Sequence, residues 1–199
     1  MISFSNICKD EPYLIFESLY KKALEKKQTA PEAASVSSFN PNTNEVESRF
    51  VNIKYLNDKK FIFFSNYRSL KANNFDKHNQ ISLLFYWNKI HAQIRIKGKI
   101  SRSDVRFSDK HYQQRSLEKN ALAHSSDQST IVNSYESVVK NYNKTLKLGN
   151  VISSRPEYWG GFDIFPYHFE FWEGNKNRLN KRTVYKFENS KWKKYFLSP

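Results

Sequence analysis

The sequence predicts an α+β fold in which helices flank a closed or nearly closed antiparallel barrel. Three observations support this prediction: apolar residues alternate with period two between residues 33 and 101, helical spacing occurs on both sides of that stretch, and strand-like segments return after residue 160. Seven to nine strands and three to five helices fit such a layout. With 199 residues, 39% of them hydrophobic, the chain suits one domain spanning residues 1–199.

Helices are predicted from start signals and from the spacing of apolar residues. The tripeptide Asp10-Glu11-Pro12 is typical of a helix start, and an apolar face follows it, so an N-terminal helix is expected within residues 10–30. Further helices are predicted at 69–77, as one or two helices over 104–125, and at 130–148. The last of these has an apolar stripe that is expected to pack in the core: Ile131, Tyr135, Val138, Val139 and Tyr142.

Strands are predicted where apolar and polar residues alternate. The predicted segments are 33–39, 45–56, 60–66, 80–87, 90–101, 161–165, 168–173, 182–188 and 192–197, the last two joined as a hairpin. Within 45–56, Val51 and Ile53 alternate with Asn52 and Lys54. One face of this strand is therefore apolar and the other presents polar groups, as a strand bearing a binding site would.

The chain is strongly basic, with 33 Lys and Arg against 19 Asp and Glu and a formal net charge of +14. This charge favours anionic partners, but no run of five like charges distinguishes nucleic acid from lipid or phosphorylated molecules. Nucleic-acid binding is not expected, and the longest apolar runs, 61–64 and 81–87, are too short to span a membrane. A single cysteine and no signal segment predict a cytoplasmic protein.

Several kinds of catalytic site lack support in the sequence. The chain has five glycines and no phosphate-binding glycine loop, which excludes a P-loop and a dinucleotide fingerprint. Its five histidines are isolated, so no metal site is expected, and no serine-hydrolase elbow is present. Any chemistry is therefore expected from a bound organic cofactor.

Five motifs occur in order along the chain. They are RFVNIK (49–54), FFSN (63–66), RPEYWGGF (155–162), EFWEG (170–174) and RLNKR (178–182). Together with isolated matches between them, this pattern resembles the pyridoxamine/pyridoxine 5'-phosphate oxidase family over residues 10–199.

The resemblance implies an FMN-binding split barrel that works as a homodimer with two flavin sites at the subunit interface. Residues 150–199 would form a segment for dimerisation and substrate binding. The residues that would bind FMN are Arg49, Val51, Asn52, Lys54, Phe64, Ser65, Ser69, Lys71, Gln93, Gln128, Ser129, Trp172 and Arg182. Arginine and lysine supply the charge-assisted hydrogen bonds that a flavin phosphate needs.

The same resemblance implies a second set of residues around the substrate, which carries its own phosphate. They are Lys54, His111, Arg115, Lys119, Arg178 and Asn180. Lys54 and Arg115 match the two cations that bind this phosphate in the family, and Arg178 matches an arginine beside the pyridine ring.

This chain departs from the family pattern mainly at the substrate. A family tyrosine falls on His111, although a one-residue shift of the helix would place Tyr112 there instead. Lys119 replaces a serine, Asn180 a histidine and Lys181 an acid. Near the flavin phosphate Leu70 replaces an arginine, for which Arg68 is a candidate substitute.

The activity implied is an FMN-dependent oxidation of pyridoxine or pyridoxamine 5'-phosphate to pyridoxal 5'-phosphate, with O2 as acceptor. Arg178, which would orient the reacting carbon, is the catalytic candidate. Because the departures lie at the substrate, another substrate, such as a phenazine-type biosynthetic intermediate, remains open. A third hypothesis is a non-catalytic module that carries flavin or pyridoxal phosphate or binds nucleic acid.

Overall fold

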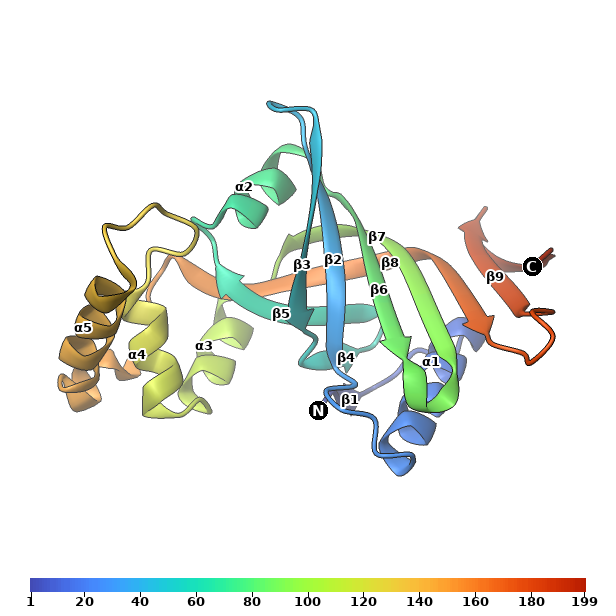
Figure 1. Cartoon of the computed structure of the whole chain (residues 1–199), viewed down its shortest axis with the longest axis horizontal. Helices are drawn as coiled ribbons and strands as arrows, with labels where there is room; N and C mark the ends of the chain where they lie inside the picture. Colours follow the sequence, from blue (N-terminus) through green and yellow to red (C-terminus); the bar gives the residue numbers. More distant parts are fainter.

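A computed structural model describes residues 1–199, except for the side chain of Asn150. Five α-helices and two short 3₁₀ helices are present, and Figure 1 shows their arrangement. They are α1 (Glu11–Glu25), α2 (Leu70–Lys77), η1 (Asn88–Ile90), α3 (Val105–Gln113), α4 (Leu117–Ser125), α5 (Tyr135–Leu146) and η2 (Gly149–Ser153). The predicted segment 104–125 thus forms two helices.

The strands form one ten-stranded sheet. They are β1 (Ser3–Ser5), β2 (Ala33–Asn40), β3 (Glu45–Asn52), β4 (Tyr55–Asn57), β5 (Lys60–Asn66), β6 (Gln80–Trp87), β7 (Ala92–Arg102), β8 (Trp159–Glu173), β9 (Lys181–Glu188) and β10 (Lys191–Leu197). The order is β1-β4-β5-β8-β7-β6-β2-β3, and β9 and β10 extend from β8. All pairs are antiparallel except β1 with β4, which is parallel.

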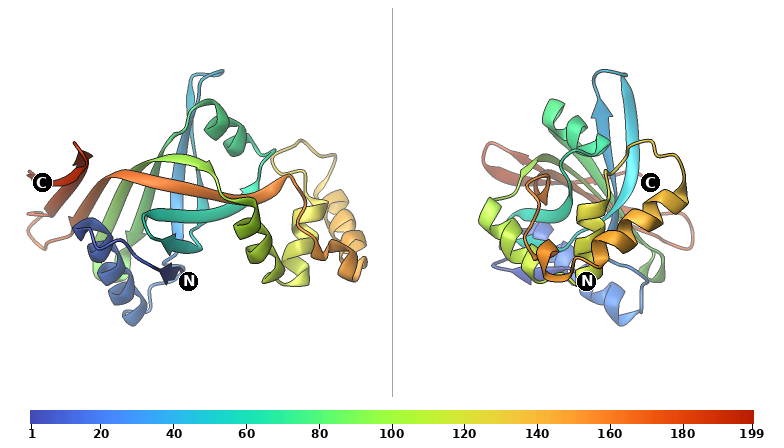
Figure 2. Two further views of the ribbon diagram at one scale, coloured as in Figure 1. Left: turned by 180° about the vertical axis from the view of Figure 1, so that it is seen from behind. Right: turned by 90° about the vertical axis from the view of Figure 1, so that its left-hand side faces the viewer.

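The sheet curls so that β3, at one end of the strand order, lies near β5 and runs on directly into β4. The α+β prediction with a nearly closed barrel is therefore confirmed. Helices α3, α4 and α5 gather at one end of the long axis, whereas α1, β9 and β10 lie at the other (Figures 1 and 2). Strand β8 runs between these two ends.

The core is built largely from aromatic side chains on α1 and the sheet. Phe16 of α1 is fully buried, and its ring meets Phe61 and Phe85 edge-on at centroid distances of 4.8 and 5.2 Å. Each such side chain contributes roughly 1.5–3 kcal/mol by leaving water. The indole N–H of Trp87 donates to the carbonyl of Pro31 at 2.9 Å, so its buried polar atom is satisfied.

Two expectations about packing differ from the structure. No residue of α5 is fully buried in the described chain: Tyr135 is 76% exposed, and Val138 and Tyr142 are only half-buried, so the apolar stripe predicted to pack in the core does not do so. The predicted strands 161–165 and 168–173 form one strand, β8, which continues through Pro166. Pro166 lies at the β-bulge opposite Lys97 and Gly98, where the ladder tolerates a residue without an N–H.

No helix among the described residues is long and apolar enough to cross a bilayer.

Candidate functional site

Lys71 lies in the first turn of α2 and is buried, with 6% of its surface exposed. Its ammonium group donates to the hydroxyl of Ser69 at 3.1 Å, and that hydroxyl donates to the carbonyl of Asn66. Burial and then the charge of Arg49 lower the pKa of Lys71 to about 8. No carboxylate pairs with it among the described side chains, and a buried cation without a counter-ion is costly.

Arg49 of β3 faces the same place. Its guanidinium donates to the hydroxyl of Ser38 at 2.7 Å and pairs with Glu47 two residues earlier on the strand. We call Arg49, Ser69 and Lys71 the Lys71 cluster. Three polar groups from β3 and α2 thus converge, and the excess of positive charge suits a phosphate.

His111 on α3 lies over the ring of Phe64 from β5. The two rings are nearly parallel, 10° apart, with centroids separated by 3.7 Å. The Nδ1 atom of His111 is 2.8 Å from the hydroxyl of Tyr55 on β4. Stacking and hydrogen bonding therefore fix the orientation of the imidazole.

Cations surround this histidine. Burial first, and then the charges of Arg115, Lys54 and Lys119, lower the pKa of His111 to about 4. We call Lys54, His111, Arg115 and Lys119 the His111 cluster. The charges that shift the imidazole are all positive. An anion bound here would relieve their repulsion.

Arg115 is held by contacts that leave no carboxylate beside it. Its guanidinium packs on the ring of Trp159 at 4.3 Å, and its Nε donates to Asn120 at 3.0 Å. A second nitrogen donates to the carbonyl of Lys119. The cation is thus positioned by an aromatic face and by neutral acceptors, so its charge is available to a ligand.

A cavity of about 260 Å³ opens between these groups and the loop after α4. Ser65 donates to the side-chain oxygen of Gln128 at 3.0 Å, which closes one side of the cavity. Its lining includes Phe64, Ser65, Asn66, Arg115, Gln128 and Trp159. The structure therefore brings together predicted residues of the flavin set and of the substrate set.

The two glycines that follow Trp159 allow the loop after β5 to approach β8 closely. A Cβ on Gly160 would overlap the hydroxyl of Tyr67, which donates to the carbonyl of Gly161 at 3.2 Å. The Trp-Gly-Gly run at the start of β8 therefore sets the distance between this strand and the loop after β5.

Three other predicted flavin residues lie together at the opposite end of the sheet. Gln93, Trp172 and Arg182 are register partners across β7, β8 and β9. Arg182 pairs with Glu170 at 2.8 Å and donates to the carbonyl of Ser198. Here the cation has a carboxylate partner inside its own chain.

Arg178 and Asn180 lie in the loop between β8 and β9. Arg178 is exposed and has a positive φ of 59°, and the side-chain oxygen of Asn180 accepts from the backbone of Asn175 at 3.0 Å. Asn180 thus helps to hold the loop that carries Arg178.

The predicted site is divided between the two ends of β8. Trp159 and Trp172 are thirteen residues apart on this strand, which corresponds to roughly 40 Å at the usual rise per residue. The Lys71 and His111 clusters lie near Trp159, and Arg178 lies beyond Trp172. One chain cannot bring both groups to a single small molecule.

The structure also shows the surroundings of Tyr112 and Arg68, the two alternatives that the departures suggested. Tyr112 is fully buried and its hydroxyl donates to the carbonyl of Ile152, whereas its neighbour His111 is the residue that contacts Tyr55 and Phe64. The guanidinium of Arg68 lies over the ring of Tyr158 at 4.7 Å, and Leu70 is exposed. Arg68 thus contacts an aromatic ring in this structure, and its role at the flavin phosphate stays a prediction.

The remaining predicted residues border the Lys71 and His111 clusters in sequence. Val51 and Asn52 end β3 between Arg49 and Lys54, with Asn52 exposed. Ser129 follows Gln128 and has a positive φ of 74°. Sequence reasoning missed Tyr55 and Ser38, which bond to His111 and Arg49; strand alternation alone gives no signal for such partners.

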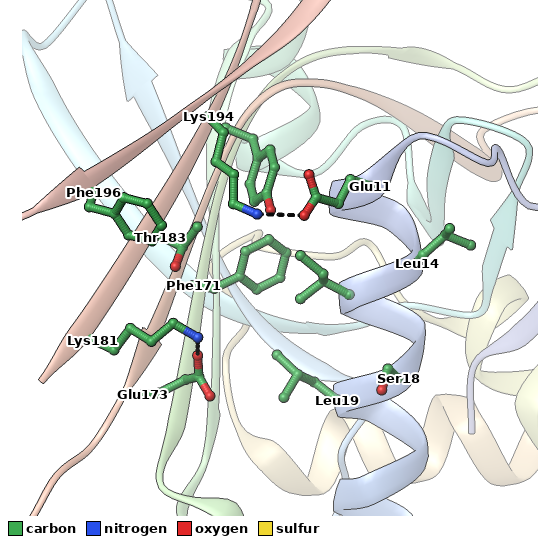
Figure 3. Close-up of a pocket in the computed structure, with 12 residues that line it drawn as sticks. Glu11, Leu14, Ser18, Leu19, Phe171, Glu173, Lys181, Thr183, Lys194 and Phe196 are labelled. Carbon is green, nitrogen blue, oxygen red and sulfur yellow. Dashed lines mark hydrogen bonds and ion pairs between the residues drawn. The ribbon is translucent and has the colours of Figure 1, made fainter.

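A different cavity, of about 450 Å³, lies between α1 and strands β8, β9 and β10 (Figure 3). Two ion pairs border it, Lys194 with Glu11 at 2.6 Å and Lys181 with Glu173 at 2.9 Å. It contains none of the predicted site residues, and both of its cations have carboxylate partners.

Residues 20–147 match the family model described as pyridoxamine 5'-phosphate oxidase, and residues 159–199 match the pyridoxine 5'-phosphate oxidase C-terminal dimerisation region. The chain belongs to the pyridoxamine 5'-phosphate oxidase family. It is thus an FMN-dependent oxidoreductase by family.

Curated relatives include the pyridoxine/pyridoxamine 5'-phosphate oxidase of Haemophilus influenzae, 30% identical over 96% of this chain and 91% of that enzyme. The enzyme of the same name from Psychromonas ingrahamii is 33% identical over 96% of this chain and 88% of its own length.

Among solved structures, PhzG from Burkholderia lata 383 in complex with tetrahydrophenazine-1-carboxylic acid superposes with a TM-score of 0.91 and 25% identity. That alignment covers 96% of this chain and 93% of PhzG. An FMN-binding relative from Nostoc punctiforme has a TM-score of 0.76 at 15% identity, covering 92% and 97% of the two chains, which supports the fold.

The residues present fit FMN. The cofactor of the family carries a phosphate, and the Lys71 cluster offers a buried ammonium and a guanidinium with too few negative partners to balance them. The chemistry of this donor set therefore matches the anionic end of the cofactor.

Proposed function

We propose that this chain is an FMN-dependent oxidase of pyridoxine or pyridoxamine 5'-phosphate that yields pyridoxal 5'-phosphate, with O2 as acceptor. The observation that carries the proposal is the presence of two separate clusters of cations at one end of the sheet. A flavin phosphate and a substrate phosphate require two anion sites, and the Lys71 and His111 clusters provide them.

The Lys71 cluster would hold the flavin phosphate. Lys71 would donate to a phosphate oxygen and recover in the complex the counter-charge that it lacks alone. Ser65 and Gln128, which already bond to each other, would meet the polar edge of the flavin ring, as would Asn52, Lys54 and the backbone near Val51. FMN supplies the two-electron oxidation when it is bound.

The His111 cluster would hold the substrate phosphate. Arg115 is positioned by Trp159 and Asn120, and Lys54 and Lys119 add charge. These residues bind and orient the substrate against the flavin, which is the main contribution that a protein makes to cofactor chemistry.

The remaining groups would come from a second copy of the chain. Five predicted residues lie at or beyond the Trp172 end of β8, too far away to reach the two clusters of their own chain: Gln93, Trp172, Arg178, Asn180 and Arg182. The match of residues 159–199 to a dimerisation region supports a homodimer in which these groups complete the partner's site. Arg178 would then orient the reacting carbon and stabilise developing charge.

A second candidate is the oxidation of a phenazine-type intermediate that carries a carboxylate. The observation favouring it is the TM-score of 0.91 with PhzG, whose structure contains tetrahydrophenazine-1-carboxylic acid. Asn180, in place of the family histidine, cannot provide a titrating group beside the substrate. The His111 cluster would attract a carboxylate as well, but it offers more positive charge than one carboxylate balances.

The test is the visible spectrum of the FMN-loaded protein during anaerobic addition of pyridoxine 5'-phosphate and, separately, pyridoxamine 5'-phosphate. The proposal predicts bleaching of the flavin bands, followed by their return with hydrogen peroxide when air is admitted. A flavin that stays yellow with both compounds would reject this activity. Bleaching by a dihydrophenazine carboxylate alone would support the second candidate.

A further inference from the structure

The His111 imidazole is placed where a neutral and a protonated ring can both be accommodated. Tyr55 lies 2.8 Å from Nδ1, and its hydroxyl can donate to a neutral ring or accept from a protonated one without moving. The face of Phe64 stacks on the imidazole at 3.7 Å and favours a positive charge above it.

The charged groups around this ring come from several elements. Arg115 follows α3, Lys119 lies on α4, and Lys54 lies between β3 and β4. The nearest acid on α3 itself is Asp109, and it is paired with Arg155 at 2.6 Å. Phe64 and Trp159 contribute uncharged rings.

These surroundings keep the imidazole neutral as long as no anion is present, since burial and three positive charges lower its pKa to about 4. A phosphate monoester carries nearly two negative charges at neutral pH. Bound among the three cations, it would cancel much of their effect on the ring. A carboxylate, with one charge, would cancel less.

We propose that His111 takes up a proton when a phosphate monoester dianion binds to the His111 cluster, so that recognition of the substrate phosphate is coupled to protonation of this residue. The proposal rests on the proposed function in assigning that phosphate to this cluster. His111 thereby favours a dianionic phosphate over a monoanionic carboxylate, and a tyrosine in its place would lose this discrimination.

The coupling has a definite sign. Binding raises the pKa of His111, so the complex holds more protons than the free protein and binding tightens as the pH falls. This pH dependence is expected above about pH 6, because below that pH the phosphate itself becomes monoanionic. Above that pH the dissociation constant rises with pH, by at most tenfold per unit for one proton.

The experiment is calorimetric titration of the FMN-loaded protein with 4-deoxypyridoxine 5'-phosphate, which lacks the oxygen substituent that is oxidised. Measurements at pH 7.5 in two buffers of different ionisation heat give the protons taken up per site. The wild type is expected to take up a measurable fraction of a proton, and His111→Tyr to take up none beyond the small amount due to the probe.

Two controls separate this effect from general damage. His124→Gln removes a nearby histidine whose Nε2 bonds to the carbonyl of Ser154, and it is expected to keep the proton uptake. Benzoate, a monoanionic carboxylate, is expected to bind the wild type with less uptake than the phosphate probe. Imidazole ¹⁵N shifts of the wild type should report a neutral His111 without the probe and a protonated one with it.

The pH dependence of probe binding tests the same coupling independently. Between pH 6.5 and 8.5 the dissociation constant of the wild type should rise at least about fivefold more than that of His111→Tyr. Equal pH profiles, equal proton uptake in the two proteins, or no binding of the probe would each overturn the inference. Binding with uptake by a protein that oxidises neither vitamin phosphate would refute the proposed function and leave this inference standing.

Discussion

Lys71 and Arg182 are both predicted flavin contacts, but their surroundings differ. Lys71 is buried with a serine hydroxyl as its hydrogen-bond partner, whereas Arg182 pairs with Glu170, which also binds Arg95 at 3.0 Å. Near Trp159, Lys71 and Arg115 have no carboxylate partner in the described chain and only Arg49 pairs with one, Glu47, whereas near Trp172 both Arg182 and Arg95 pair with Glu170. A buried charge without a partner reduces folding stability, so its persistence points to a ligand that supplies the partner.

From this difference we expect Lys71→Met to weaken FMN binding and, at the same time, to stabilise the protein without FMN. The variant should bind FMN about ten- to a hundredfold more weakly, because a charge-assisted hydrogen bond to phosphate is lost. The same substitution should raise the melting temperature of the protein without FMN, because it removes a desolvated charge. Flavin fluorescence and thermal unfolding measure the two effects.

Lys77→Met is the matched control for this experiment, since Lys77 is exposed in the last turn of the same helix. It should leave both quantities nearly unchanged. A Lys71→Met protein that is destabilised without FMN would show that the ammonium is a structural group.

At the other end, Glu170→Gln is expected to act mainly on stability. It removes the buried carboxylate that two arginines share, and the expected loss is about 1–3 kcal/mol of unfolding free energy. Chemical denaturation measures it. Glu173→Gln, which breaks an exposed pair with Lys181, should cost less than about 1 kcal/mol. Equal losses would remove the distinction between buried and exposed pairs.

Asn180→His tests whether the loop beyond Trp172 limits the activity. Restoring the family residue should raise kcat/KM for pyridoxine 5'-phosphate several-fold, because an imidazole adds a group that can carry charge beside the substrate ring. Steady-state peroxide formation measures the change. Unchanged kcat/KM with both vitamin phosphates would show that this position does not limit oxidation.

A further expected effect is a difference in acid stability. Because the pKa of His111 is lowered to about 4 in the folded protein, the unfolded chain binds a proton first as the pH falls below 6.5. The contribution of this residue is therefore present above pH 6.5 and is lost as the pH falls towards 4. Unfolding free energies of His111→Phe should decline less steeply over this window than those of the wild type.

Much of the fold was predictable because its signals are local. Alternation marked most strands, and a capping segment with proline marked α1. β1 has only three residues and pairs in parallel with β4, which leaves too short a pattern to detect. The break expected at Pro166 was wrong because a bulge in β8, at Tyr167 opposite Lys97 and Gly98, accommodates it, and a bulge depends on the pairing with the partner strand.

The prediction that the apolar stripe of α5 packs in the core was wrong for a related reason. A helix face that packs in its own core and one that remains outside it have the same periodicity, and the sequence of one chain does not distinguish them. For the proposed site, the motifs predicted which residues would take part. They could not show that the two groups of predicted residues lie near opposite ends of β8, or that Tyr55 bonds to His111.

The most direct test of the account compares FMN with riboflavin, which lacks the phosphate. Quenching of flavin fluorescence should give an affinity for FMN at least about tenfold higher than for riboflavin in the wild type, and this gap should shrink in Lys71→Met. Equal affinities for the two flavins in the wild type would contradict the claim that the Lys71 cluster forms the flavin phosphate site.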